Sequence, residues 1–243
     1  MPEQLWFTEI LNRYLAGPVN TLLQSVHVRP EFPQAPISNA TAMELLVFLF
    51  LVLMFVLFRI GLSVERPSAV QHMFESFHGF VEGQSGELID HHPETFTSFL
   101  VTLGLFILFS NLLGLIPGFE SPTGVVVVPF GCAVLAFLYY QFYGFRRNGI
   151  GYIKHFFGPV WWLAPLMLPI EIISHLARVL SLTVRLYANM FAGDMIIWVW
   201  FSLIPIGIPI IFLGLHAFVA LLQAYIFILL TMAYLAGAVA HEH

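Results

Sequence analysis

The stretch from Glu171 to Asp194 is as apolar as a membrane span, yet five of its side chains are charged or can become charged. They are Glu171, His175, Arg178, Arg185 and Asp194. A charge at the centre of a bilayer helix costs about 2.5–3.5 kcal/mol on insertion scales, so such groups usually face protein or water. The stretch therefore requires a membrane helix with a polar partner or an aqueous cavity beside it.

The charged groups of this helix fall on two sides. Glu171, Arg178 and Arg185 follow one another at intervals of seven residues, which forms a nearly straight stripe at 3.6 residues per turn. Asp194 lies nine residues after Arg185 and falls on the opposite face. The stripe side also carries His175 and Asn189. The helix thus presents cations to one neighbour and a carboxylate to another.

A band of small side chains lies beside the Arg185 stripe and consists of Ala177, Ser181, Ala188 and Ala192. Small residues let a second helix approach closely in a membrane. A purely structural alternative is a buried Glu171–Arg178 ion pair that only joins helices. It leaves Arg185 unexplained, because no carboxylate lies three or four positions from that residue.

Composition indicates that the rest of the chain is also a membrane protein. Of the 243 residues, 59% are hydrophobic and 9% charged, whereas soluble domains carry about 25% charged residues. Backbone polar groups in lipid must be satisfied within their own segment, so we predict an all-α, polytopic protein. The single Cys132 excludes a disulfide within the chain. The predicted membrane-crossing segments are 43–58, 96–116, 125–143, 159–201 and 210–239.

The chain divides into an N-terminal surface segment, 1–40, and a single transmembrane domain, 41–243. Within that domain, apolar residues recur at intervals of three and four over 67–82, which predicts an amphipathic helix in the membrane interface. A polar loop is expected over 83–94. By the positive-inside rule, basic residues place the N-terminus outside and the C-terminus in the cytoplasm. The residues used are Arg59, Arg66, Arg146, Arg147 and Lys154.

The last 85 residues predict a long helical hairpin, 159–240, whose turn lies at 202–209. Its first helix is too long for an upright span of about 20 residues, so it is strongly tilted or broken near its prolines. His216 and Gln223 are seven residues apart and share a face, with Tyr234 near it. Asp194 lies about as far before the turn as His216 lies after it. Asp and His can exchange protons within a membrane, while Arg stays charged, so the pair predicts a proton path.

These segments resemble the F-type ATP synthase a subunit. SLTVRLYANMFAGD is similar to the SLxLRLxxNxxAGE signature of that family, and FVALLQAYIFILLTMAYL, preceded by His216, to its last helix. FSNLLGLIPG resembles the NLxxLxP motif, and YGFRRNGIGYIKHFFGP resembles the Gly-Ile-Gly loop. Two segments depart from the family: Gly114 stands where some members carry an acid, and TGVVVVPFG replaces a polar TxDxNxT sequence at the start of the third span.

The resemblance implies a static proton-channel subunit beside a rotating c-ring, held with the stator subunit b in the inner membrane of a bacterium. Arg185 matches the essential channel arginine, and Glu171 matches a carboxylate of the inner side. The outer half-channel and its neighbourhood correspond to Asp194, His216, Asn189 and Gln223. Secondary candidates are His175, Arg178, Asn111 and Tyr234. Protons are the implied cargo, and no cofactor, metal or nucleic acid is expected.

Two other functions are possible from the residues alone. A secondary transporter or channel with its own midplane site predicts inverted repeats or paired broken helices, and the sequence contains neither. A purely structural membrane anchor would not require a charged residue such as Arg185 within a membrane helix. The chain has no phosphate-binding glycine loop or catalytic triad, so any enzyme activity belongs to a larger complex.

Overall fold

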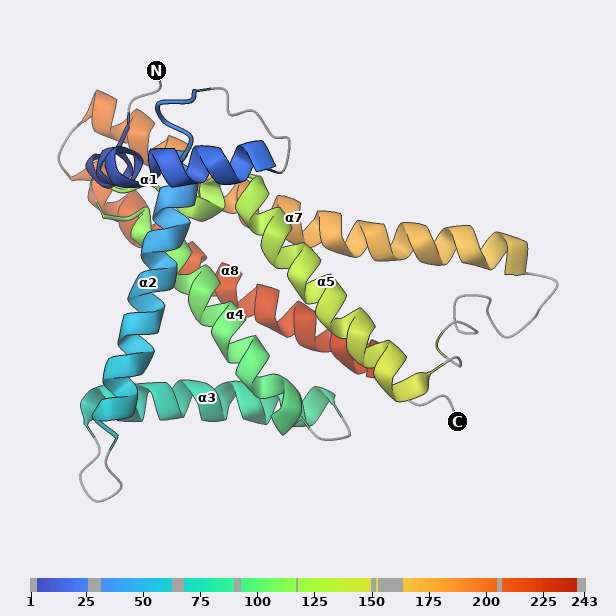
Figure 1. Ribbon diagram of the computed structural model, residues 1–243. Helices are drawn as coiled ribbons and strands as arrows, with labels where there is room; N and C mark the ends of the chain where they lie inside the picture. Colours follow the sequence, from blue (N-terminus) through green and yellow to red (C-terminus); the bar gives the residue numbers. More distant parts are fainter. Residues whose placement is uncertain are drawn as a thin grey trace.

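The computed structural model describes residues 4–25, 32–62, 68–89, 93–116, 118–149, 152, 164–204 and 207–239. This part of the chain is helical and contains no strand (Figure 1). The elements are α1 (Trp6–Ser25), α2 (Asn39–Ile60), α3 (Ala69–Leu88), α4 (Glu94–Leu113), the 3-10 turn η1 (Pro122–Gly124), α5 (Val127–Asn148), α7 (Ala164–Leu203) and α8 (Ile208–Val239). The prediction of an all-α, polytopic protein is confirmed, since five helices are long and apolar enough to cross a membrane.

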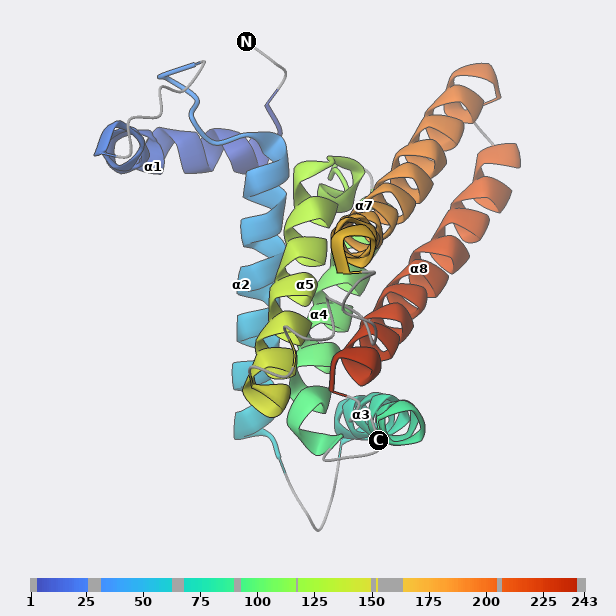
Figure 2. The ribbon, with the colours of Figure 1, turned by 90° about the vertical axis from the view of Figure 1, so that its right-hand side faces the viewer.

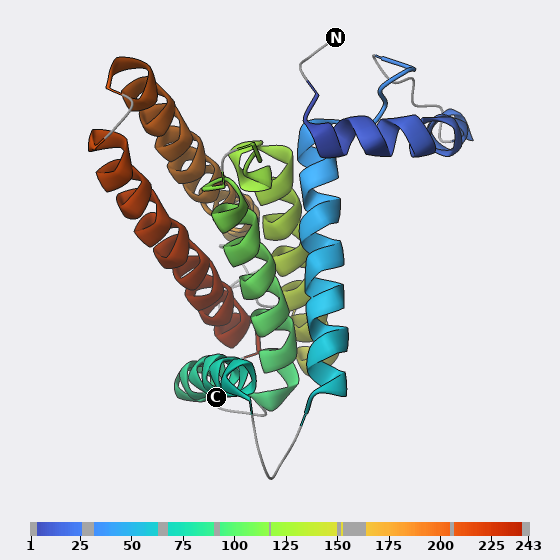
Figure 3. The same cartoon turned by 90° about the vertical axis from the view of Figure 1, so that its left-hand side faces the viewer.

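The five spans differ in their inclination. Helices α2, α4 and α5 stand roughly side by side, whereas α7 and α8 form an antiparallel pair that leans away from them (Figures 2 and 3). Figure 2 shows the first turns of α7 nearly end-on and the remainder rising obliquely, so this helix curves. Helices α1 and α3 lie crosswise at opposite ends of α2 (Figure 1).

The structure of the long hairpin decides between two alternatives for its first helix and corrects the start of its second. Helix α7 is unbroken over 40 residues with Pro169 inside it, and α8 begins at Ile208, before Pro209, rather than after a turn that ends there. Pro209 is the second residue of α8, where the backbone N–H has no helical partner to lose. Pro169 is the sixth residue of α7, so the helix continues there with one backbone hydrogen bond missing. Gly207 lies just before α8 with φ of 92°, a left-handed value that favours glycine.

Helix α3 is longer than predicted, because 83–88 continue the helix instead of forming a loop. The glycines and polar side chains of this segment predicted a loop, but tertiary packing outweighs their low helix propensity. Val81 and Ile89 are almost fully buried. The Ser85 hydroxyl donates a hydrogen bond to the Glu82 carbonyl and lies 3.4 Å from the Thr97 hydroxyl of α4. The helix begins at Ser68, whose hydroxyl accepts a hydrogen bond from the Gln71 N–H.

The core that holds the hairpin against the upright helices is apolar and closely packed. Leu186 and Met190 of α7, Ile107 of α4, Ala133 of α5 and Phe227 of α8 have no exposed surface. These contacts fix the rotation of α7 and α8 about their own axes, and so determine which polar side chains of the hairpin face each other.

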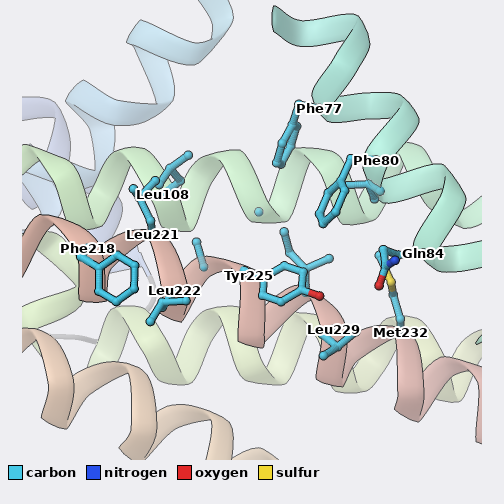
Figure 4. Close-up of a pocket in the computed structure, with 14 residues that line it drawn as sticks. Phe77, Phe80, Gln84, Leu108, Phe218, Leu221, Leu222, Tyr225, Leu229 and Met232 are labelled. Carbon is cyan, nitrogen blue, oxygen red and sulfur yellow. The ribbon is translucent and has the colours of Figure 1, made fainter.

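An apolar pocket of about 410 Å³ lies between α3, α4 and α8 (Figure 4). Figure 4 shows Phe77 and Phe80 of α3 opposite Tyr225 of α8. None of the predicted proton-translocation residues lines this pocket.

Candidate proton-translocation site

Asp194 and His216 lie together, as the position of the hairpin turn predicted. Oδ1 of Asp194 is 3.6 Å from Nε2 of His216, and the two side chains are 30% and 2% exposed. Neither ring nitrogen of His216 has a hydrogen-bond partner in the described part of the chain. A buried polar group without a partner is costly, so this arrangement is typical of a site that works with water or a transferred proton.

A second polar pair joins the same two helices farther from the turn. The Asn189 side-chain amide of α7 donates a 2.8 Å hydrogen bond to Oε1 of Gln223 of α8. A pocket of about 180 Å³ reaches from Asn189 past Gly193 to His216. It is large enough for several water molecules. One member of each polar pair, Asn189 and His216, therefore lines the same small cavity.

Arg185 lies one turn beyond Asn189 and is partly exposed. Its guanidinium donates a long, 3.4 Å hydrogen bond to the Ser181 hydroxyl. Among the described residues it forms no ion pair with a carboxylate. The predicted band of small residues is exposed at each of its positions: Ala177, Ser181, Ala188 and Ala192. The helix thus has a permanent cation beside a surface that another helix could approach closely.

The other end of the stripe forms a separate cluster. The Glu171 carboxylate lies 3.5 Å from Nε2 of His175, and Nδ1 of that histidine is 3.3 Å from the Tyr140 hydroxyl. The Arg178 guanidinium lies 5.2 Å from the centroid of the Tyr234 ring, a cation–π contact. The Glu171–Arg178 ion pair of the structural alternative is absent among the described residues, because each group has a different neighbour.

Asn111 is fully buried and connects three segments. Its side-chain amide donates to the Ala220 carbonyl of α8 at 3.1 Å, and its Oδ1 accepts a 2.7 Å hydrogen bond from Thr123 of η1. The Ser121 hydroxyl donates to the Ser110 carbonyl of α4. The sequence reasoning missed Ser121 and Thr123. Both residues lie in a short polar segment between two spans, and such a segment is typical of an ordinary connecting loop.

The η1 segment also explains the two departures from the family motifs. A Cβ atom at Gly114 would lie 2.7 Å from Cβ of Ser121, and one at Gly124 would lie 3.3 Å from Oδ2 of Asp194. Side chains larger than glycine therefore have no free space at position 114, and η1 itself closes over Asp194. The Ser121 and Thr123 hydroxyls of this turn bond to each other and to α4 rather than to Asp194.

Comparison with known proteins agrees with these features. The family model described as ATP synthase A chain matches residues 41–236. The chain is similar to ATP synthase subunit a of Koribacter versatilis, with 57% identity over all of both chains. It is 50% identical to ATP synthase subunit a of Solibacter usitatus, over 96% of this chain and 100% of that one. For ATP synthase subunit a of Geobacter sp. the identity is 42%, over 73% and 77% of the two chains.

Proposed function

Because the chain belongs to the ATP synthase A chain family, we propose that Arg185 is the fixed cation between two half-channels that carry protons to and from a rotating partner. The function of the chain is proton translocation in the membrane sector of an F-type ATP synthase. The residues that perform it, the partner surfaces and the orientation are inferred below.

The outer half-channel consists of Asp194, His216 and the Asn189–Gln223 pair. The pocket beside His216 supports this assignment, because it connects the imidazole to Asn189, one turn from Arg185. Protons can move between carboxylate, imidazole and water, whereas the amides can only orient water by hydrogen bonds. The path stops at the guanidinium, which neither accepts nor releases a proton under physiological conditions.

The inner half-channel starts on the other side of Arg185. Its titratable groups are Glu171 and His175, with Tyr140 behind the histidine. The Arg178 guanidinium, which lies over the Tyr234 ring, adds a permanent positive charge on the same side of α7. With Arg185 between the two polar regions, a proton has no continuous route through the subunit.

The proposed partner is a ring of c subunits against the exposed small-residue band. A carboxylate on a ring helix must be neutral in lipid, because burying its charge is costly. Opposite Arg185 it can ionise, since a nearby cation favours the charged form. Each elementary charge that crosses the membrane contributes about 2.3 kcal/mol per 100 mV to rotation. Stator subunit b is the other proposed membrane partner.

We place the end of the molecule that carries α1 outside the membrane and the end that carries α3 in the cytoplasm. Arg59 and the Arg146–Arg147 pair end α2 and α5, and these ends lie on the α3 side (Figure 1). Basic residues prefer the cytoplasmic side. Arg66, Lys154 and the C-terminal residues 240–243 lie outside the described residues. In this orientation 1–40 is a surface segment of a bacterial inner membrane protein, 41–243 is the transmembrane domain and α3 is interfacial.

The observation that carries the proposal is Arg185, a cation that has no carboxylate partner among the described residues and lies beside an exposed band of small residues. In vesicles containing the whole complex, Arg185→Ala should abolish ATP-driven proton pumping and leave a passive leak. Arg13→Ala, which removes an exposed cation from α1, should pump normally. Pumping at the wild-type rate by Arg185→Ala would refute the mechanism. The subunit reconstituted without the ring should conduct no solute, whereas a secondary transporter would.

A further inference from the structure

The segment that covers the Asp194–His216 pair carries a carboxylate that has no role in the mechanism above. Glu120 precedes η1 and is exposed. The Asn39 side-chain amide at the start of α2 donates a 3.4 Å hydrogen bond to it. The preceding Phe119 packs edge-on against Trp6 of α1, with ring centroids 6.1 Å apart. Glu120 is thus held at the end of the molecule where α1 lies.

Glu120 precedes the turn that ends at Gly124, where a Cβ atom would lie 3.3 Å from Oδ2 of Asp194, so the turn that carries Glu120 packs against this carboxylate. Three titratable groups then follow one another with decreasing access to solvent: Glu120 is exposed, Asp194 is 30% exposed and His216 is 2% exposed. They come from three different segments, and the innermost is an imidazole without a hydrogen-bond partner among the described residues. Such a series is suited to bring a proton from bulk water to a buried site.

The position of Glu120 also accounts for the missing acid at Gly114. Ser121 occupies the space where a side chain at position 114 would lie. The same turn carries Glu120, one residue before Ser121, and Glu120 is exposed to solvent. The chain therefore has a carboxylate near the pair, but it stands on the loop instead of on α4.

We propose that Glu120 collects protons from water at the mouth of the outer half-channel and passes them to Asp194. This inference rests on the function proposed above. The ionised Glu120 takes a proton from water and becomes neutral, then releases it through intervening water to the Asp194 carboxylate and is ionised again. The charged and titratable groups facing Glu120 in the described structure are Asp194 of α7 and, beyond it, His216 of α8. The polar contact from α2 is the neutral amide of Asn39.

The test compares Glu120→Gln with the wild type in proteoliposomes containing the whole complex, with ATP synthesis driven by an imposed membrane potential. The pH of the compartment that α1 faces is varied. Paired carboxylates at a mouth raise the local concentration of cations, so the variant should be about tenfold slower where protons are scarce. The deficit should shrink as that compartment is acidified, because Asp194 can then take protons directly. Glu120→Asp should restore most of the rate.

The substitution Glu9→Gln on α1 removes an equally exposed carboxylate that takes no part in the site, and it should leave the rate unchanged. Glu120→Gln keeps an oxygen that can accept the hydrogen bond from Asn39, so a defect reports the lost charge. A normal rate at every pH, or the same fractional loss at every pH, would overturn the inference. If Asp194→Asn slows synthesis while Glu120→Gln does not, only this inference fails. If neither variant is slow, the outer half-channel assignment fails with it.

Discussion

The imidazole of His216 packs directly against the backbone of Gly193, so that a Cβ atom at position 193 would overlap the ring. Helices α7 and α8 approach each other closely at this point because α7 has no side chain there. Asp194 is the next residue, and its carboxylate consequently lies beside the ring edge that carries Nε2. A glycine in the interior of a membrane helix thus determines where the titratable pair forms.

We expect Gly193→Ala to displace the His216 ring and to disable proton translocation while the complex still assembles. A misplacement of about 1 Å can lower the rate of a positioned reaction about 100-fold. Gly237→Ala on α8 is the matched control, since a Cβ there meets no atom within 4 Å. Proton pumping in vesicles measures the effect. Normal pumping by Gly193→Ala would show that this packing is irrelevant to function.

Asp194 and His216 should behave as one unit. Asp194→Asn and His216→Gln should each slow proton conduction, and the double variant should cost less than the sum, because both changes break one path. Exchanging the two residues should restore more conduction than either single variant retains. Proton flux is measured for all four variants in vesicles. Strict additivity without recovery in the exchanged variant would assign the two residues to separate steps.

The exposed positions Ala188 and Ala192 should face the ring. In a background in which the buried Cys132 is replaced by Ala, a cysteine at either position should form a disulfide with a cysteine placed mid-helix on a c subunit. A cysteine at Thr183, which is 4% exposed, should not. Cross-links from the Asp194 side of α7, with none from Ala188 or Ala192, would mean that another face meets the ring.

The buried Asn111 should contribute to stability through its two partners. Asn111→Leu removes the hydrogen bonds to the Thr123 hydroxyl and the Ala220 carbonyl, each of which contributes about 0.5–1.5 kcal/mol net. Thermal unfolding of the detergent-solubilised complex should therefore begin at a lower temperature. The exposed Thr102→Val on the same helix is the control. An unchanged unfolding temperature for Asn111→Leu would contradict the prediction.

The Asp194–His216 pair could be predicted from the sequence because its proximity depends only on helix geometry and on the position of one turn. Equal distances from the turn place two residues of an antiparallel hairpin at one level, whatever the details of packing. The exposed small-residue band followed in the same way from residue spacing. Local periodicity is sufficient for such features, since each depends on one helix or on two helices joined by a short connection.

The contacts of η1 could not be predicted in that way. Thr123 meets Asn111 and Gly124 meets Asp194 only after α4, α7 and α8 have packed, and no spacing rule links these positions. The extension of α3 through Ser85 is similar, because a contact with Thr97 outweighs the low helix propensity of the glycines nearby. Sequence patterns were insufficient wherever tertiary contacts between distant segments decided the outcome.

The crosswise helices at the two ends of α2 have a mechanical consequence. With 22 residues and a rise of 1.5 Å per residue, α2 is about 33 Å long, close to the roughly 30 Å of a bilayer's hydrocarbon core. Helix α1 is tied to the start of α2 by paired hydrogen bonds between Asn12 and Ile37. A span held at both surfaces adjusts poorly to a thinner bilayer by tilting. A subunit held in this way keeps a constant depth in the bilayer, and under the function proposed above Arg185 then stays level with the ring.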